Sequence, residues 1–328
     1  MTRVLILSST QDLHAMEVMK NLDSLSCPYT VLRFEEFRSG FKLRHIIGGQ
    51  HRKTDLEIGE KKVDLQEVKS IWHRRPGLFI VPTTPEPYIG QMIELETRDS
   101  ISGILNSLSC LWVNRPLNDT QTMRKLLQLE YAKQVGMEVP LTLVTTDPES
   151  VEKFFDECDG QVIYKLIGET TGQFLPRSEI IGIPTLPLRK SDLKHLKQVA
   201  HAPHLFQKMI AKVFDVRVTV IGKKLFGCRI HSQSGRGTID WRGDYSVDMQ
   251  PVDISNVLQE QIFSLMKRFR LNYAAFDFCE LADGQMVFIE VNSAGQYIWM
   301  EERTKQPLSL EMAKLLAGES EPLCAQTD

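Results

Sequence analysis

"YAAFDFCELADGQMVFIEVN" (273–292) contains two strand-like segments on either side of Asp283-Gly284. Asp-Gly between such segments is the strongest short-range signal of a β-hairpin. A two-residue turn at this dipeptide sets a register in which Asp277 lies directly opposite Glu290, and a four-residue loop sets the same register. The sequence therefore predicts an antiparallel strand pair with two carboxylates facing each other.

Asn292 lies two residues beyond Glu290 and so points to the same face of its strand. Directly opposed carboxylates destabilise a strand pair unless a cation lies between them. A site with few ligands, all of them oxygen atoms, suits Mg²⁺, which keeps waters and is often shared with phosphates. We expect Asp277, Glu290 and Asn292 to bind this metal; the alternative is a solvated strand end. The opposite face is expected to be core: Phe276, Phe278, Val287, Ile289 and Val291.

Two cationic side chains stand in apolar strands upstream. In "FDVRVTVIGKKLFGC" (214–228) Arg217 alternates with valines, and its planar fork suits a phosphate in the site or, alternatively, a carboxylate at the rim. Lys165 in "VIYKLI" (162–167) needs either a phosphate or a buried acid. "QKMI" (207–210) ends a short apolar strand, where backbone groups can serve an adenine edge.

The composition is that of a soluble globular protein. The chain has 328 residues, 42% apolar and 25% charged, with a net charge of −3. Without a basic excess no nucleic-acid partner is expected, and local groups must hold any anion. Six scattered cysteines without a C-x-x-C pair favour a reduced, cytoplasmic protein. No signal peptide and no apolar run near the roughly 18 residues of a membrane span are found.

The order of predicted elements indicates an α/β fold in three parts. Strands and helices alternate over residues 1–115, which predicts a small domain with a mostly parallel sheet. Residues 116–210 are expected to form a central lobe with a loop and helix that bind a peptide. Residues 211–328 are expected to form a C-terminal lobe with antiparallel hairpins and the metal site.

The candidate residues resemble, in their order, the pattern of the ATP-grasp superfamily: Lys125 after an Asn-Arg-Pro loop, Lys165, "QKMI", Arg217, Asp277, Glu290 and Asn292. The resemblance spans most of the chain and includes an N-terminal α/β (pre-ATP-grasp) domain. Among these enzymes the sequence is most similar to the microviridin-type (graspetide) ligases, which macrocyclise ribosomally made peptides. That similarity rests on "WHRRP" (72–76), "IHSQ…DWR" (230–242), "NYAAFD" (272–277) and "EVNSAGQYIWME" (290–301).

The resemblance implies ATP and Mg²⁺ as cofactors and a role for each matching residue. Lys125 and Lys165 would hold the phosphates, and Arg217 would contact the transferred phosphate or the acyl phosphate. The adenine would be bound by Gln207, Lys208, Met209 and Ile210. ATP would phosphorylate an Asp or Glu side chain of a precursor peptide, and a Thr or Ser hydroxyl or a Lys amine of the same peptide would then close an ester or amide ring. The resemblance also implies a homodimer.

The resemblance further implies a helical leader segment of the precursor that docks near residues 168–200, with Asp192 paired to a leader arginine. The alternative is that Asp192 caps its own helix or is a solvated acid of the first turn. Arg74 and Arg75 are candidates for contact with acidic side chains of the core peptide; the alternative is an ion pair between domains. Ser293 departs from the proline that often follows the Asn in these enzymes, which leaves the choice of ester or amide open.

Two other functions are compatible with the same residues. One is an ATP-grasp ligase that joins small molecules or adds amino acids to a protein, as glutathione-synthase-like and ribosomal-modification enzymes do. The other is a nucleotide-binding regulator without catalysis, which the complete set of candidate ligands disfavours. The "DWR" and "YIWME" signatures favour the peptide macrocyclase.

Overall fold

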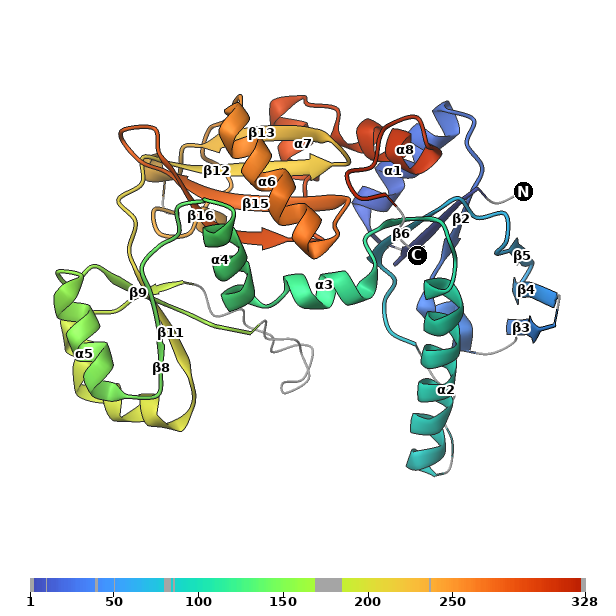
Figure 1. The fold of residues 1–328 in the computed structure, drawn as a ribbon, viewed down its shortest axis with the longest axis horizontal. Coiled ribbons are helices and arrows are strands. Elements are labelled where there is room, and N and C mark those ends of the chain that lie inside the picture. Colours follow the sequence, from blue (N-terminus) through green and yellow to red (C-terminus); the bar gives the residue numbers. More distant parts are fainter. Residues whose placement is uncertain are drawn as a thin grey trace.

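The computed structural model describes residues 3–9, 11–38, 41–49, 51–79, 84, 86–168, 185–235 and 237–325. Three parts follow one another along the molecule (Figure 1): the parallel N-terminal sheet, a five-stranded antiparallel sheet and a smaller sheet at the far end. None of the helices in these ranges is long and apolar enough to cross a membrane.

The N-terminal sheet contains four parallel strands in the order β2-β1-β6-β7. The strands are β1 (Val4–Ser8), β2 (Tyr29–Leu32), β6 (Ser70–Arg75) and β7 (Leu111–Val113), and the helices are α1 (Leu13–Ser24) and α2 (Pro87–Asn106). All five residues of β1 are buried, as is usual for a parallel strand covered on both faces. The predicted mostly parallel sheet is therefore confirmed.

A second, antiparallel sheet follows β2 and is absent from the sequence-based prediction. It contains β3 (Phe41–Gly48), β4 (His51–Ile58) and β5 (Lys61–Asp64), after a 3₁₀ helix η1 (Phe34–Arg38). Side chains of β3 are at most half-buried along its whole length. The strand therefore lacks the strong apolar pattern that identifies a core strand.

The central part contains a four-stranded sheet with the strand order β10-β9-β11-β8. Its elements are α3 (Pro116–Thr122), α4 (Lys125–Gln134), β8 (Thr142–Thr145), α5 (Pro148–Glu157), β9 (Val162–Lys165), β10 (Leu186–Pro187), the 3₁₀ helix η3 (Lys190–His201) and β11 (His204–Lys208). An apolar cluster packs α5 and η3 against one face of this sheet. Residues 169–184, part of the region 168–200 predicted to dock the leader peptide, lie outside the described residues.

The C-terminal sheet runs β14-β13-β12-β15-β16, with every neighbouring pair antiparallel. Its elements are β12 (Phe214–Ile221), β13 (Lys224–Ile230), η4 (Ser232–Ser234), η5 (Trp241–Gly243), β14 (Met249–Pro251), α6 (Asn256–Phe269), β15 (Tyr273–Glu280), β16 (Met286–Asn292), α7 (Ile298–Thr304) and α8 (Leu308–Ala317). Helix α6 covers the face that carries Val216, Val218 and Val220. Arg217 therefore lies on the other face, as predicted.

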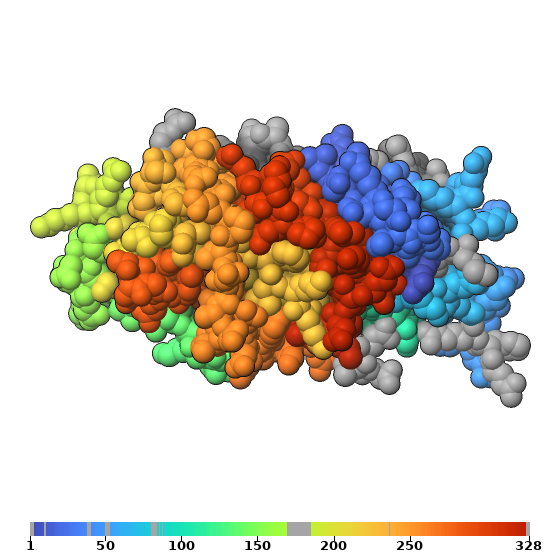
Figure 2. Space-filling model, turned by 90° about the horizontal axis from the view of Figure 1, so that it is seen from above, coloured from blue at the N-terminus to red at the C-terminus, as the bar shows by residue number. Residues whose placement is uncertain are grey.

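The N-terminal and C-terminal parts of the chain share one apolar cluster. It includes Val4 and Trp72 from the first sheet and Tyr297, Met300 and Met312 from the last two helices. In Figure 2 the residues of α8, in red, lie directly against those of α1, in blue. The first sheet is thus packed firmly against the C-terminal lobe.

The hairpin of β15 and β16 has the predicted pairing but a different turn. Leu281 N–H donates to Gln285 O (2.9 Å), which closes a three-residue loop in which Gly284 has φ +85°. A bulge further along the ladder adds one residue to β16, so that Asp277 still lies opposite Glu290. The predicted two- or four-residue loop is therefore wrong, while the predicted opposition of the two carboxylates is confirmed.

The bulge also changes which side chains of β16 face the core. Phe288 is fully buried and packs with Phe276, Phe278 and Val291. Ile289 instead lines the pocket beside Glu290, because the extra residue lets two successive side chains point to the same face. The prediction that Ile289 belongs to the core is therefore wrong.

Candidate active site

A cavity of about 760 Å³ lies between the C-terminal sheet and the central sheet, and both sheets supply lining residues. Most of the predicted nucleotide- and metal-binding residues line it: Lys125, Lys165, Gln207, Lys208, Met209, Ile210, Asp277, Glu290 and Asn292. They come from five elements or their ends, namely α4, β9, β11, β15 and β16. The fold thus brings together groups that are up to 167 residues apart, from position 125 to position 292.

The predicted metal ligands meet at one end of this cavity. Asp277 and Glu290 are cross-strand partners, and Arg217, the partner of Asp277 on the other side, donates from Nη1 to its Oδ2 (2.8 Å). Asp277 Oδ1 and Arg217 Nε are buried and have no hydrogen-bond partner among the described residues. Burial raises the pKa of Asp277, and the neighbouring Arg217 only partly offsets this. A divalent cation fits here, since it would use the free carboxylate oxygen.

Carboxylates alone do not complete a metal site. In the described ranges no group of three or more His, Cys, Asp and Glu side chains could hold a metal ion. Asn292 extends the pair of carboxylates with an amide oxygen, which also accepts from Ala294 N–H (2.9 Å). A metal bound here would depend on further oxygen ligands such as water or phosphate, which is the usual arrangement for Mg²⁺.

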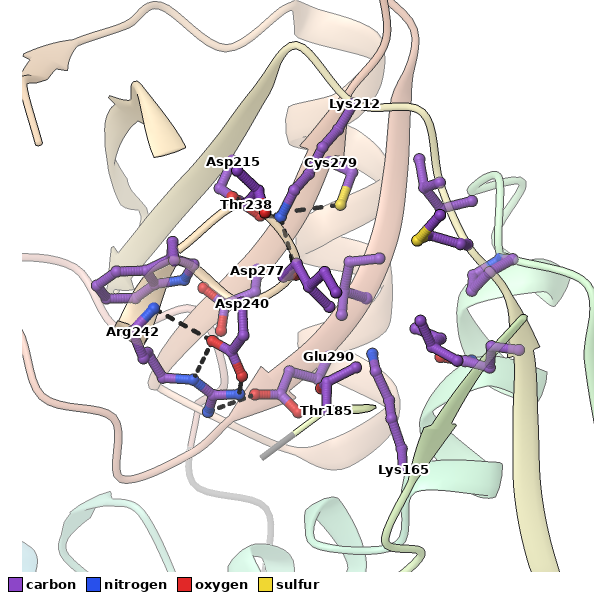
Figure 3. A pocket seen from close by; sticks show the side chains of 18 of the residues that line it. Lys165, Thr185, Lys212, Asp215, Thr238, Asp240, Arg242, Asp277, Cys279 and Glu290 are labelled. Atoms are coloured by element: carbon purple, nitrogen blue, oxygen red, sulfur yellow. Dashed lines mark hydrogen bonds and ion pairs between the residues drawn. The ribbon is translucent and has the colours of Figure 1, made fainter. Parts of the chain in front are cut away.

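The opposite wall of the cavity carries the two predicted lysines. Burial lowers the pKa of Lys165, and the charge of Glu290 restores it only in part. Figure 3 shows the Lys165 side chain pointing into the space beside Glu290. Lys125 Nζ donates to Leu166 O (2.8 Å), at the end of the same strand. A desolvated ammonium group favours an anion, and phosphate oxygens fit this wall.

The segment 207–210 follows β11 along the edge of the cavity. Gln207 lines the cavity, but its side chain is 3% exposed and its amide donates to Thr142 Oγ1 (3.0 Å). Met209 N–H donates to Gln161 O (2.8 Å), which fixes the path of the backbone. Any contact with a base at this segment is therefore expected from backbone groups.

Arg242 and Asp240 also lie in the cavity, and the sequence did not assign them a role. Arg242 makes two hydrogen bonds of 2.8 Å to the Asp240 carboxylate, and its Nη1 lies 3.5 Å from Glu290 Oε1. The hydrogen bond with Asp240 raises the pKa of Arg242. Figure 3 shows the guanidinium between the two carboxylates. The signal that could have found this pair is the "DWR" motif (240–242) itself.

A second pair, Lys212 and Asp215, lines the other end of the cavity (Figure 3) and was also missed. Lys212 Nζ lies 2.7 Å from Asp215 Oδ2 and donates to Ile239 O (3.1 Å). This lysine joins β12 to the loop before η5. The loop that carries Asp240 is thus contacted by Lys212 at Ile239 and by Arg242 at Asp240.

The three predicted peptide-binding residues lie outside the cavity. Asp192 Oδ2 accepts from Arg189 N–H (2.9 Å) at the start of η3, as the alternative of helix capping expects. The pairing of Asp192 with a leader peptide stays a prediction. Arg74 is 4% exposed and pairs with Asp12 of the same domain (3.1 Å), so that neither an ion pair between domains nor a contact with a peptide is shown. Arg75 is exposed, and its contact with a peptide stays a prediction.

Comparison with known proteins bears on the fold. A family model described as the MvdD pre-ATP grasp domain matches residues 3–120. No curated protein matches the sequence. The macrocyclase MdnC from Microcystis aeruginosa MRC, solved with its precursor peptide MdnA, is 27% identical, with a TM-score of 0.82 over 97% of this chain and 100% of MdnC.

Two further structures share the fold. A RiPP-associated ATP-grasp ligase from Chryseobacterium gregarium, solved with ADP and a leader and core peptide, is 23% identical, with a TM-score of 0.88 over the whole of both chains. The ATP-grasp ligase PsnB, solved with minimal precursor, Mg and ADP, is 21% identical, with a TM-score of 0.74 over 96% of each chain. The chain therefore has the ATP-grasp fold with an N-terminal pre-ATP-grasp domain, and its resemblance to the ATP-grasp ligases that macrocyclise ribosomal peptides is confirmed.

Proposed function

We propose that this protein is an ADP-forming ATP-grasp ligase that closes rings in a ribosomal precursor peptide. ATP would phosphorylate an Asp or Glu side chain of the peptide. A Thr or Ser hydroxyl, or a Lys amine, of the same peptide would then displace phosphate to form an ester or an amide. The observation that carries this proposal is the meeting of Asp277 and Glu290 in one cavity with the desolvated Lys165.

The predicted site residues divide into four roles in this proposal. Asp277, Glu290 and Asn292 would hold Mg²⁺, which supplies charge neutralisation during phosphoryl transfer. Lys125 and Lys165 would bind phosphate oxygens, and the backbone of 207–210 would bind the adenine. Arg217 lies against Asp277 (2.8 Å) and would contact the transferred phosphate. Catalysis of this kind needs positioning and opposite charge rather than a protein nucleophile.

The partner in this proposal is a peptide with a helical leader and a core rich in acidic and hydroxyl side chains. The structure of MdnC contains a precursor peptide, as do those of the other two similar ligases. Asp192 and Arg75 remain candidates for its recognition. We further propose a cytoplasmic homodimer that needs no membrane or nucleic acid, with parts bounded at 1–115, 116–210 and 211–328.

The metal assignment is tested by replacing one ligand at a time. Asp277→Asn and Glu290→Gln are expected to abolish Mg²⁺-dependent ADP release without unfolding the protein, because each removes a negative charge from the metal. Glu280→Gln is the matched control, since Glu280 is a buried acid of the same strand that pairs with Arg229 away from the cavity. Wild-type turnover in both site variants would refute the assignment.

A further inference from the structure

The backbone that follows β16 is held by side chains rather than by a neighbouring strand. The last ladder pair of β16 joins Asn292 to Ala275, and residues 293–298 (loop 293–298) then lead into α7. This loop passes between the C-terminal sheet and the N-terminal part of the molecule. Buried polar groups from the N-terminal part hydrogen-bond to it at three successive points.

The first point is at Ser293. Asn114, which is 2% exposed, donates from Nδ2 to Ser293 O (3.0 Å) and to Tyr273 O (2.8 Å). Its Oδ1 accepts from Tyr273 N–H (3.1 Å) and from Asn272 N–H (2.8 Å). One amide from the end of the N-terminal sheet thus ties the start of β15 to the residue that follows Asn292.

The second point is at Ala294 and Gly295. Arg74, at the end of β6, donates from Nη1 to Ala294 O and to Gly295 O (3.3 Å). Its Nε lies 3.1 Å from Asp12 Oδ2, an ion pair that places a carboxylate behind the guanidinium. Tyr273 Oη also donates to Gly295 O (2.6 Å).

The third point is at the start of α7. His14 Nε2 accepts from Tyr297 N–H (2.9 Å) and Ile298 N–H (3.3 Å). Because Nε2 is the acceptor, the proton of the neutral ring is on Nδ1, which lies 3.1 Å from Asp12 Oδ1. Asp12 therefore orients both His14 and Arg74.

Loop 293–298 touches the candidate metal and phosphate groups at its other side. Ala294 N–H donates to Asn292 Oδ1 (2.9 Å), and Arg217 Nη2 donates to Gln296 O (3.4 Å). The packing is close, since a Cβ on Gly295 would lie 2.7 Å from Arg217 Nη2. A shift of the loop would therefore move the Asn292 amide and the Arg217 guanidinium together.

We propose that His14, Arg74 and Asn114 are positioning residues through which the N-terminal domain aims Asn292 and Arg217 at bound Mg²⁺ and phosphate. The inference rests on the proposed function, because it presumes that the cavity binds a metal–nucleotide complex. None of the three residues lines the cavity. Loss of groups that orient metal ligands commonly weakens metal affinity by about 10- to 100-fold.

The test compares variants that do and do not release the loop. His14→Leu removes the acceptor for two N–H groups, while His14→Gln keeps an acceptor oxygen near the position of Nε2. Arg74→Met removes the contacts to Ala294 and Gly295. Ser70→Ala is the matched control: Ser70 Oγ donates to Leu316 O (2.7 Å) across the same interface, far from the loop.

ADP binding is measured by calorimetry on each full-length variant, over a series of Mg²⁺ concentrations and in EDTA. We expect His14→Leu and Arg74→Met to need about 10- to 100-fold more Mg²⁺ for half-maximal tightening of ADP binding. Their ADP affinity in EDTA should match the wild type, Ser70→Ala should behave as wild type, and His14→Gln should recover most of the loss. Should His14→Leu not fold, Arg74→Lys provides the same comparison, since it keeps a charge beside Asp12 but cannot span both carbonyls.

The contrary outcomes are distinguishable. A wild-type Mg²⁺ requirement in both His14→Leu and Arg74→Met would overturn the positioning role. A wild-type protein whose ADP binding does not respond to Mg²⁺ would overturn the proposed function and the inference with it.

Discussion

Lys165→Met is expected to have opposite effects on nucleotide binding and on stability. Lys165 lies in β9 between apolar neighbours, and burial lowers its pKa despite the nearby charge of Glu290. The folded protein without a ligand therefore disfavours this charge. Methionine keeps a similar length without the charge, so the free energy of unfolding should rise or stay unchanged in the absence of nucleotide.

The affinity for ADP, in contrast, should fall in Lys165→Met. A charge-assisted hydrogen bond to a phosphate contributes about 1.5–3 kcal/mol, and its loss would weaken ADP binding by about 10- to 150-fold. Calorimetry gives the dissociation constant for ADP, and urea unfolding gives the stability of the same preparation. Lys153→Met, an exposed position on α5 of the same lobe, is the control and should change neither quantity.

The combination of both results tests the reasoning about Lys165. A variant that is clearly less stable than the wild type would show that Lys165 is a structural ion-pair partner rather than an unsatisfied cation. Unchanged ADP affinity would show that its ammonium group does not meet a phosphate. Either result would refute the reasoning about this wall of the cavity.

Two further predictions concern the frame around the site. The hydrogen bond from His14 and the charge of Arg74 outweigh burial and hold the pKa of Asp12 at about 2, below the ordinary value of 3.8. Ionised Asp12 therefore stabilises the fold fully above about pH 4, and this stabilisation is lost as the pH falls towards 2. The difference in unfolding free energy between wild type and Asp12→Asn should shrink by about 2 kcal/mol over that range. Gly284→Ala should lower the unfolding free energy by about 1 kcal/mol, because φ at this position is +85°, while leaving ADP affinity unchanged; a neutral effect on stability would contradict the assigned loop geometry.

Sequence reasoning placed the opposed carboxylates correctly, although it misjudged the path between them. The register depends on both the turn and the ladder, and a three-residue loop plus a bulge gives Asp277 the same partner as a two-residue turn without one. A bulge is not readable from period-2 alternation, because its extra residue is defined only by the partner strand. For that reason Val287 and Ile289 were assigned to the wrong face, since Val287 pairs with Cys279 of the cavity face, and Phe288 was missed.

The roles of Arg74 and Arg242 were not predictable for a different reason. Each is defined by groups distant in the sequence: Arg74 by Ala294 and Gly295, and Arg242 by its approach to Glu290. Local sequence shows only that a cation is present. Which anion or carbonyl it meets depends on how the lobes pack.

β3 marks the limit of prediction for secondary structure. The strand "FKLRHIIG" (41–48) has no buried residue, and its sheet is stabilised through buried side chains of β4 and β5 such as Leu56 and Val63. Its apolar residues are interrupted by charged ones and do not form the continuous run of a core strand. β12 and β15, in contrast, are almost wholly buried and were predicted as strands, whereas the short strands β10 and β14 were not.

The central claim is the ATP-dependent closure of rings in a peptide, and intact mass measures it most directly. A short acid- and hydroxyl-rich peptide encoded beside this gene is incubated with the protein, ATP and Mg²⁺. The account predicts the loss of one water mass per ring, dependent on ATP and absent with Asp277→Asn; fragmentation and mild base then separate esters from amides. An unchanged peptide mass, with ADP still released when amino acids or small peptides are supplied, would contradict the account.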